Sequence, residues 1–381
     1  LSWSEYCAKT IGVARSLIAM GFEAGDKLSI HSYNRWEFNS AFAAANMCGG
    51  VNVGVYQTCS PEEIEWVVGN SDSKIVVVGN NPMDGGDPEK MCSHRLHSVL
   101  DNLPKVEAVV VMDGVDMPYH PKAMSWSEFI SRGAGVGDDE VHARIAAIDP
   151  HDVASLCYTS GTTGKPKGVM ITHDNFEFGI GSIHEIEDYD QGDCYVSWLP
   201  GSHIFSMVAC QHLTAIDAIH MHIVDNPLNA IDYCKEVRPH IFIAVPRIYE
   251  KVHSNLVAGL GGKAKLLGVP VLGGIIKKKA QAAVGWDRCK YMVTGAAPIN
   301  PDILHFFHKL GIPLFEGWGL SESTAGSSIC YKGNNKIGSV GKPMVGTEAK
   351  IADDGEILIR GRHIMKGYYN NPEATAEVMD G

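Results

Sequence analysis

The 381-residue chain lacks the features that mark membrane-spanning, disulfide-rich or zinc-ribbon proteins. No apolar run reaches the roughly 20 residues that a transmembrane helix needs, and no signal-peptide pattern is visible. The ten cysteines are scattered without a Cys-x-x-Cys pair, which argues against a zinc ribbon and against a dense disulfide framework. We therefore expect a reduced, cytoplasmic setting. The chain begins at Leu1 rather than Met, so we expect a fragment. Whether a targeting segment has been lost is left open.

Positive charge is also scarce, since the chain has 32 Lys and Arg but 44 Asp and Glu, which gives a net charge of −12. This balance argues against a nucleic-acid-binding protein that works through a broad basic surface. It does not argue against ATP, because a few local lysines outweigh a distant surface charge. The 17 histidines include His203, His212, His220 and His222, but no carboxylate or cysteine spacing completes a zinc ligand set.

A Walker A loop is absent as well, because Gly161 and Gly164 are only two residues apart and Lys165 precedes a proline. What stands there is a run of hydroxyls, glycines and two lysines from Thr159 to Lys167, between two apolar segments. Small residues let backbone N–H groups turn toward an anion, and lysines add positive charge. The run predicts strand, phosphate-holding loop and strand, with a solvated hairpin as the alternative.

The alternation of strand and helix signals predicts an α/β fold with parallel sheets covered by helices. Ser60 and Glu63 form a capping-box pattern at one helix start. The pattern changes near residue 333, so we expect domains at 1–332 and 333–381, the second a small antiparallel β subdomain. Residues 79–90 and 258–274 are Gly-rich and predict connections. The expected strands are Lys27–His31, Val51–Val55, Lys74–Val78, Tyr195–Leu199, Ile219–Val224, Ile241–Val245, Lys290–Thr294 and the hairpin Thr347–Ile351 with Glu356–Arg360. The expected helices are Arg35–Met47, His203–Ala215, Pro227–Val237, Pro246–Val257 and Asn300–Lys309.

A second cluster runs from Gly317 to Ser323 and reads Gly-Trp-Gly-Leu-Ser-Glu-Ser. Gly317 and Gly319 clear space around the Trp318 face, as a stacked base would require. Glu322 offers the carboxylate oxygen that Mg²⁺ bound to phosphates prefers. The alternative is a core tryptophan beside a surface glutamate. Gly295-Ala296-Ala297-Pro298 follows a predicted strand and could border a ligand, or could be an ordinary turn capped by Asn300.

The twelve residues from Leu156 to Lys167 resemble the AMP-binding signature of the acyl-adenylate-forming superfamily, which includes acyl-CoA synthetases, luciferases and peptide-synthetase adenylation domains. Gly317–Glu322 is similar to the second motif of that superfamily, with Trp318 for Tyr and Ser321 for Thr. The resemblance covers essentially the whole chain in motif order. It implies the large N-terminal domain of such an enzyme, with two parallel-rich sheets and a small antiparallel β subdomain but without the small C-terminal domain.

Leu199-Pro200-Gly201-Ser202-His203 resembles the Leu-Pro-x-x-His stretch of acyl-CoA synthetases, although Gly201 departs from the Leu of long-chain enzymes. By position, Ser202 could cap a helix with His203 in its first turn. No Asp occupies this stretch, which disfavours an amino acid substrate by comparison with peptide-synthetase modules. The segments Val237–His240 and Val245–Lys251 look like the long-chain, bubblegum-type branch.

The resemblance implies an AMP-forming long-chain fatty acid–CoA ligase that uses ATP, Mg²⁺ and CoA. Another acid, medium-chain or aromatic, and a catalytically inactive nucleotide-binding relative stay as alternatives. The catalytic set would be His203, Lys165, Ser321 and Glu322, with Glu322 as the metal ligand and Phe205 near the acyl entrance. The nucleotide would be held by Thr159, Ser160, Gly161, Thr162, Thr163, Gly164, Lys165, Lys167, Gly295, Ala296, Ala297, Pro298, Gly317, Trp318, Gly319 and Ser321.

In the family, a Thr-Gly-Asp triplet follows a segment like Met365–Pro372, and its Asp binds ribose. The chain stops short of that triplet, so we expect weak nucleotide binding and little turnover from these residues alone. Lys277-Lys278-Lys279 predicts a solvated helix surface, with contact with an anionic membrane as the alternative. The sequence indicates no nucleic-acid partner and leaves the oligomeric state open.

Overall fold

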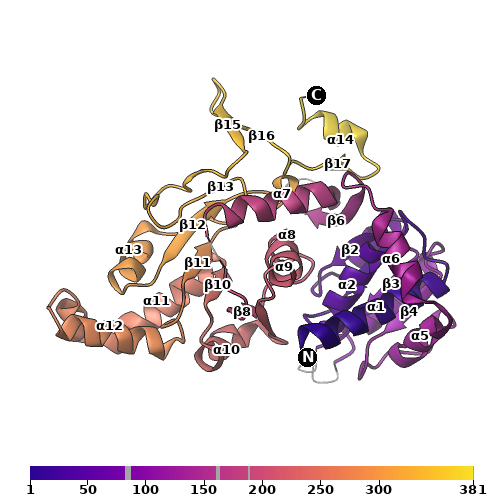
Figure 1. The fold of residues 1–381 in the computed structure, drawn as a ribbon, viewed down its shortest axis with the longest axis horizontal. Coiled ribbons are helices and arrows are strands. Elements are labelled where there is room, and N and C mark those ends of the chain that lie inside the picture. Colours follow the sequence, from indigo (N-terminus) through magenta and orange to yellow (C-terminus); the bar gives the residue numbers. More distant parts are fainter. Residues whose placement is uncertain (82–86, 160–163, 188, 381) are drawn as a thin grey trace. The chain divides into compact units, whose positions relative to one another are not determined.

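The computed structural model describes residues 1–81, 87–159, 164–187 and 189–380. They group into two compact units, each with its own sheet. The first unit comprises Leu1–Glu177, Pro200–Gln211 and Ile364–Gly381, and the second comprises Phe178–Leu199 and His212–His363. Figure 1 shows the elements and their labels. The domain division expected at residue 333 stays a prediction.

The first unit contains an eight-stranded sheet in the order β17-β7-β6-β2-β1-β3-β4-β5. The six neighbouring strands β6, β2, β1, β3, β4 and β5 run parallel. At the β6 edge, β7 pairs antiparallel with β6, and β17 pairs antiparallel with β7. The strands are β1 (Lys27–His31), β2 (Val51–Val55), β3 (Ile75–Val78), β4 (Ala108–Val111), β5 (Ala123–Ser125), β6 (Val153–Thr159), β7 (Lys167–Thr172) and β17 (Gly367–Tyr368).

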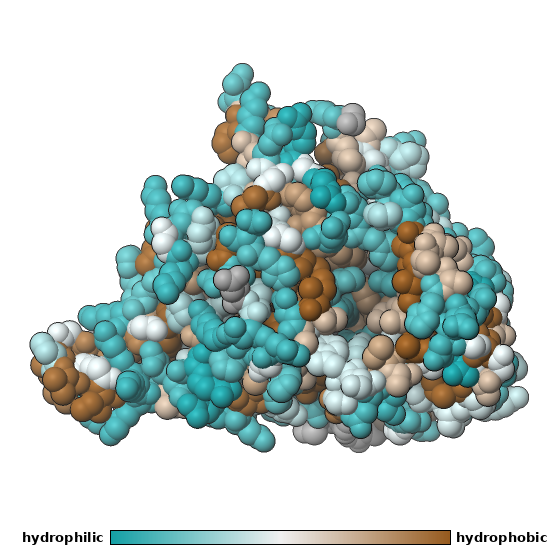
Figure 2. All heavy atoms as spheres, in the orientation of Figure 1, coloured by the Kyte–Doolittle hydropathy of each residue, from teal (hydrophilic) through white to brown (hydrophobic). Residues whose placement is uncertain are grey.

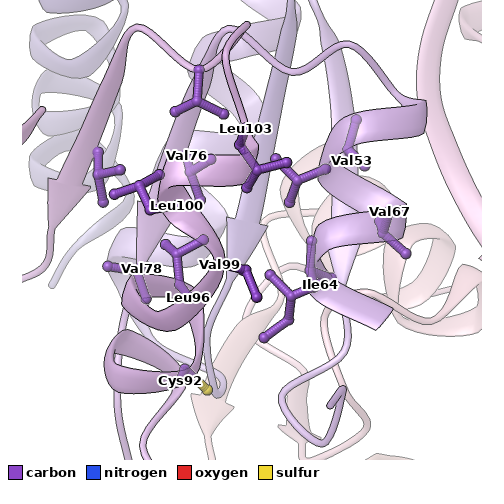
Figure 3. Close-up of a cluster of buried hydrophobic side chains, with 14 of the residues drawn as sticks. Val53, Ile64, Val67, Val76, Val78, Cys92, Leu96, Val99, Leu100 and Leu103 are labelled. Carbon is purple, nitrogen blue, oxygen red and sulfur yellow. The ribbon is translucent and has the colours of Figure 1, made fainter. Parts of the chain in front are cut away.

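Helices cover this sheet because its central strands are apolar on both faces, as buried parallel strands are. Val53, Val76 and Val78 pack in one buried cluster with Ile64 of α3 and Leu96 of α4 (Figure 3). The capping box at the start of α3 is confirmed, since the Ser60 hydroxyl accepts from the Glu63 N–H at 3.3 Å and Ser60 N–H donates to the Glu63 carboxylate at 2.8 Å. The helices are α1 (Trp3–Ala19), α2 (Trp36–Met47), α3 (Pro61–Asn70), α4 (Cys92–Val99), α5 (Trp126–Arg132), α6 (Asp138–Ala146), α8 (Ile204–Ser206) and α14 (Pro372–Ala376).

The second unit contains a seven-stranded sheet in the order β14-β13-β12-β11-β10-β8-β9 and a separate hairpin, β15-β16. The hairpin pairs Glu348–Ile351 with Ile357–Arg360 antiparallel, as predicted. The strands are β8 (Cys194–Ser197), β9 (His220–Ile223), β10 (Ile241–Ala244), β11 (Tyr291–Thr294), β12 (Leu314–Trp318), β13 (Ser328–Ile329), β14 (Lys342–Pro343), β15 (Glu348–Ile351) and β16 (Ile357–Arg360). The helices are α10 (Ala230–Val237), α11 (Pro246–Leu260), α12 (Leu272–Ala283) and α13 (Pro301–Lys309), and α7 (His173–His184) begins in the first unit.

The α/β architecture with two parallel-rich sheets is therefore confirmed, and each predicted strand lies within a residue or two of its expected bounds. Two expectations are wrong in detail. Residues 258–274 are not simply a connection, because α11 extends to Leu260, a 3₁₀ segment spans Gly261–Leu266 and α12 begins at Leu272. The helix expected at His203–Ala215 contains a π-helix, η4 (Met207–Leu213), between α8 and α9 (Thr214–Ile216). Among the helices described, none has the length and hydropathy needed to cross a bilayer.

Candidate functional site

The predicted strand–loop–strand arrangement is formed by β6 and β7, which pair antiparallel with Thr159 opposite Lys167. Ser160, Gly161, Thr162 and Thr163 lie outside the described residues. Gly164 has a φ of +126°, in a region that side chains disfavour. The stem of the predicted phosphate loop is thus a strand pair that projects Lys165 and Lys167 from its returning arm.

Two aromatic rings hold these lysines within the first unit. The Lys165 ammonium lies 4.2 Å from the centre of the Trp66 ring, and the Lys167 ammonium lies 4.8 Å from that of Tyr368. Trp66 also donates its indole N–H to the Pro166 carbonyl at 2.9 Å. An ammonium over an aromatic face is attracted by about 0.5–1 kcal/mol at exposed sites. Both lysines are therefore positioned by rings, and neither forms an ion pair with a carboxylate of the described residues.

Sequence reasoning missed both rings. Trp66 lies 100 residues before Pro166, and nothing in its helix signals a contact with the loop. Tyr368 belongs to the Met365–Pro372 segment that the resemblance singled out, but no role was assigned to it. Strand β17 brings it to β7, where Tyr368 pairs with Val169.

His203 lies in a turn of the first unit that packs against the sheet. The Gly201 N–H donates to the Asn34 side-chain oxygen at 3.0 Å, and Gln211 donates to the Gly201 carbonyl at 3.2 Å. A Cβ on Gly54 of β2 would lie 2.6 Å from the Ser202 Cα. The turn therefore approaches the strand so closely that only glycine fits at position 54.

The cap of helix α8 differs from the expectation. His203, not Ser202, is the N-cap residue, and its Nδ1 accepts the Phe205 N–H at 3.2 Å. Ser202 is 2% exposed, and its hydroxyl has no hydrogen-bond partner in the described part of the chain. Burial lowers the pKa of His203. The imidazole is therefore neutral near pH 7, and acceptance at Nδ1 leaves its proton on Nε2.

The helix after His203 continues as the π-helix η4, a conformation that is rare and frequent at functional sites. The Ser155 hydroxyl of β6 lies 3.5 Å from the sulfur of Met207, the first residue of η4. Met207 and Ser155 both belong to the first unit, so the part of the predicted acyl-side helix up to Gln211 is placed beside the strand that leads into the phosphate loop.

In the second unit, the two predicted adenine-side segments come together at the carboxyl ends of β11 and β12. These strands run parallel, with Thr294 opposite Glu316. A Cβ on Gly295 would lie 3.0 Å from the Gly317 carbonyl oxygen, and one on Gly319 would lie 2.1 Å from that of Ala325. The carboxyl ends of parallel strands are where α/β proteins bind ligands. Ala296, Ala297 and Pro298 are exposed there.

Ser321 and Glu322 begin a 3₁₀ turn directly after this edge, and both are half-buried. The Leu320 N–H donates to the Ser323 hydroxyl at 2.9 Å, and Ser327 donates to the same hydroxyl at 2.8 Å. Thr324, with a φ of +50°, is left-handed. Hydrogen bonds and an uncommon backbone conformation therefore fix the turn that carries the predicted metal ligand.

No group of three or more His, Cys, Asp or Glu side chains that could hold a metal is found where the chain is described. A metal at Glu322 would thus depend on one carboxylate together with phosphate oxygens and water. Mg²⁺ in nucleotide enzymes has that preference, so the residues fit the predicted ion.

A buried polar pair beneath the adenine-side edge was not predicted. Glu316 is 8% exposed, and burial raises its pKa. Thr294, its partner in register, is fully buried, and its hydroxyl has no hydrogen-bond partner among the residues described. A glutamate in the apolar segment Leu314-Phe315-Glu316 is the signal that could have indicated it.

The structure thus assembles the predicted residues in two groups. Lys165, Lys167 and His203 belong to the first unit, and Gly295–Pro298 and Gly317–Glu322 belong to the second. Their roles in binding and catalysis stay predictions.

Comparisons with known proteins are consistent across the whole chain. A family model described as AMP-binding enzyme matches residues 1–369. The long-chain-fatty-acid–CoA ligase ACSBG2 of Xenopus laevis is 31% identical over 420 residues, which cover 100% of this chain and 56% of that protein. The long-chain-fatty-acid–CoA ligase FadD15 of Mycobacterium bovis is 28% identical and covers 98% of this chain and 65% of that protein.

Solved structures share the fold. A fatty acyl CoA synthetase of Mycobacterium tuberculosis gives a TM-score of 0.75 at 21% identity, over 100% of this chain and 68% of that one. The N-terminal domain of FACL13 from the same organism gives 0.72 at 22% identity, over 99% of this chain and 86% of that one. The chain spans 56% of the ACSBG2 relative, little more than half its length.

Proposed function

Because the chain belongs to the AMP-binding enzyme family, we propose that it forms the acyl-adenylating part of a long-chain fatty acid–CoA ligase. The acid's carboxylate oxygen attacks the α-phosphorus of ATP, and the bond to the β-phosphate bridging oxygen breaks, which gives acyl-AMP and pyrophosphate. The thiol of CoA then displaces AMP to form the thioester. The observation that carries the proposal is the loop stem between β6 and β7, where Lys165 and Lys167 are held on aromatic rings. The long-chain fatty acid is proposed as the substrate because the relatives are named long-chain-fatty-acid–CoA ligases.

The first step brings two anions together, so positive charge and positioning supply most of the acceleration. Lys165 and Lys167 would attract the β- and γ-phosphates and stabilise the departing pyrophosphate. Thr159 and Gly164 border the loop, whose other expected contacts are Ser160, Gly161, Thr162 and Thr163. Glu322 would hold Mg²⁺, which when bound offsets the charge on the phosphate oxygens.

The adenine would lie at the carboxyl ends of β11 and β12. Gly295 and Gly319 lie so close to neighbouring backbone that a side chain would not fit at either position. Trp318 offers an aromatic face for stacking, a contact that is worth about 1–3 kcal/mol per base in other nucleotide sites. Ser321 would donate to the α-phosphate.

His203 would donate from Nε2 to the fatty acid carboxylate. A neutral imidazole suits this role, because it orients the carboxylate without forming an ion pair that would weaken its attack. Phe205 and the π-helix beyond it would border the acyl chain.

The proposal is tested by trapping acyl-AMP with hydroxylamine, in the 381-residue chain and in the product of the complete reading frame. A panel of long-chain, medium-chain and aromatic acids separates the substrate classes. We expect hydroxamate from long-chain acids, with much less from Lys165→Ala and no change for the exposed Lys332→Ala. Hydroxamate only from an aromatic or medium-chain acid would overturn the substrate, and its absence with every acid would favour a nucleotide-binding relative without catalysis.

The setting proposed for this activity is the cytoplasm, where ATP and CoA are available.

A further inference from the structure

The hairpin β15-β16 is exposed over most of its length. Ile351, Ile357 and Leu358 are 62%, 47% and 39% exposed, and the ion pair between Arg360 and Glu348 lies on its surface. Figure 2 shows hydrophobic and hydrophilic residues side by side at the top, in the position that this hairpin occupies in Figure 1. Two strands alone are marginally stable in water, so the hydrogen bonds at the two ends of the hairpin matter for its position.

The end that follows β16 meets the turn that carries Glu322. The Thr324 hydroxyl donates to the His363 carbonyl at 2.7 Å, across 39 positions of the chain. His363 is fully buried, and Thr324 is 2% exposed. A buried carbonyl that loses its donor is costly, so this bond is a specific connection between the hairpin and the turn within the second unit.

Thr324 depends on such a bond because its backbone conformation is unfavourable. Its φ is +50° and that of Ala325 is +73°, in the left-handed region that branched side chains rarely adopt. A residue in this region keeps its conformation only where its surroundings fix it. Thr324 directly follows the 3₁₀ turn Ser321–Ser323, so the contacts that hold Thr324 also set the direction of the backbone that carries Glu322.

The side chain of His363 is fixed in turn against helix α7. Its ring stacks on that of Phe178, with the ring centres 5.5 Å apart and the planes 17° from parallel. A Cβ on Gly361 would lie 2.7 Å from Nδ1 of His363, and one on Gly346 would lie 2.6 Å from the Phe178 ring. A side chain at either glycine would therefore displace one of the stacked rings. The stack holds His363, and with it the carbonyl that Thr324 contacts.

The other end of the hairpin is joined to α7 by a bond of the same kind. The Ser182 hydroxyl shares its hydrogen between the carbonyls of Val345 and Phe178, both at 2.9 Å. Val345 lies before β15, so this bond joins the hairpin to α7 rather than to the Glu322 turn. Ser182 therefore provides a comparison within the same unit, in which a hydroxyl-to-carbonyl bond can be removed at the other end of the hairpin.

We propose that Thr324 is a positioning residue, whose hydrogen bond to His363 holds the turn in the shape in which Glu322 binds Mg²⁺ together with ATP. The inference rests on the proposed function, in which Glu322 is the metal ligand. Thr324 and His363 are buried and act through the turn. A site with one protein carboxylate depends on the placement of that single group, so a small displacement of Glu322 lowers the metal affinity.

The experiment measures the affinity of the complete protein for ATP by isothermal titration calorimetry, with Mg²⁺ and with EDTA in its place. The ratio of the two affinities reports the contribution of the metal. Thr324→Val keeps the branched shape and removes the hydroxyl, and it should lower the ratio about three- to tenfold, as the loss of one buried hydrogen bond does. Thr324→Ser keeps the hydroxyl and should restore most of the ratio. Phe178→Leu, at a half-buried position, removes the stack on His363 and should lower the ratio by a smaller factor.

Ser182→Ala is the matched control. It should lower the melting temperature, because it also removes a hydroxyl-to-carbonyl bond, and leave the ratio unchanged. A Thr324→Val protein that melts at a lower temperature but keeps the ratio would show that the bond is only structural and would overturn the positioning role. An equal fall of the ratio in Ser182→Ala would also overturn it.

Glu322→Gln separates this inference from the proposed function. We expect it to lower the ratio at least as far as Thr324→Val does. If Glu322→Gln lowered the ratio and Thr324→Val and Phe178→Leu did not, the positioning role alone would be wrong and the metal ligand would stand. An unchanged ratio in Glu322→Gln would overturn the metal ligand of the proposed function, and the positioning role with it.

Discussion

At the scale of single residues, aromatic rings position the charges of the phosphate loop. Lys165 rests on Trp66, and Lys167 rests on Tyr368, which is itself only 7% exposed. An ion pair with a carboxylate would also have positioned them, but it would have cancelled the positive charge that a polyphosphate needs. The rings fix the ammonium groups and leave that charge available.

We therefore expect Trp66→Leu to raise the KM for ATP about two- to fivefold, the equivalent of one exposed cation–π contact. The kcat should change less, because the lysine itself remains. Trp66→Phe keeps a ring but loses the hydrogen bond to Pro166, and should restore part of the affinity. Steady-state kinetics of the complete protein measures both, with Trp3→Leu in α1 as control. A purely structural role for Trp66 would lower kcat and the melting temperature in both variants and leave KM unchanged.

His31 shows the cost of burying a titratable group. It is fully buried at the end of β1, and burial, with a smaller effect from Arg95, lowers its pKa to about 3. Because the folded-state pKa is below the unfolded value of about 6.5, the folded state resists protonation. Its contribution to stability is complete above pH 6.5 and is lost as the pH falls toward 3.

We expect the free energy of unfolding to fall by about 2 kcal/mol between pH 7 and pH 5 from this residue alone. His31→Leu should lack that part of the pH dependence. Denaturant unfolding of both proteins at the two pH values measures the difference. Parallel curves for wild type and variant would show that His31 is protonated as readily in the folded state as in the unfolded state.

At the scale of elements, close backbone contacts place the acyl-side turn. Strand β2 and the turn at 200–203 belong to one unit, and Gly54 is the point where they meet. The π-helix η4 follows at once, and its Met207 lies beside β6. The position of His203 thus depends on the packing of a strand that is distant in sequence.

Gly54→Ala should destabilise the protein by about 1–3 kcal/mol, as overpacking of a core does. It should also raise the KM for the fatty acid, because the added methyl group displaces the turn that carries His203. Gly12→Ala in α1 is the control, since a Cβ there meets nothing within 4 Å. Thermal melts and kinetics of both variants test this. A Gly54→Ala protein as stable and active as the Gly12→Ala protein would contradict the packing argument.

At the scale of the whole molecule, the sequence predicted the local features and missed the distant contacts. The valine-rich strands, the Ser60 capping box and the β15-β16 hairpin follow from residues close together in the chain, and all are confirmed. The contact of Trp66 with Pro166 joins residues 100 positions apart, and no local pattern encodes it. The helix surface expected at Lys277–Lys279 lies in α12, but the start of that helix was missed because Gly273 and Gly274 suggest a loop, although Gly273 is required by a close contact with Leu267.

In the proposed function, Lys165 holds the phosphates of ATP and Trp318 holds its adenine. Equilibrium binding of ATP and of AMP to wild type, Lys165→Ala and Trp318→Ala tests this proposal most directly, since AMP lacks the two phosphates that the lysines would hold. We expect Lys165→Ala to weaken ATP binding about tenfold or more and to leave AMP binding within about twofold, while Trp318→Ala weakens both nucleotides alike. If Lys165→Ala spared ATP, or Trp318→Ala spared AMP, the two groups would not bind the same nucleotide and the account would be contradicted.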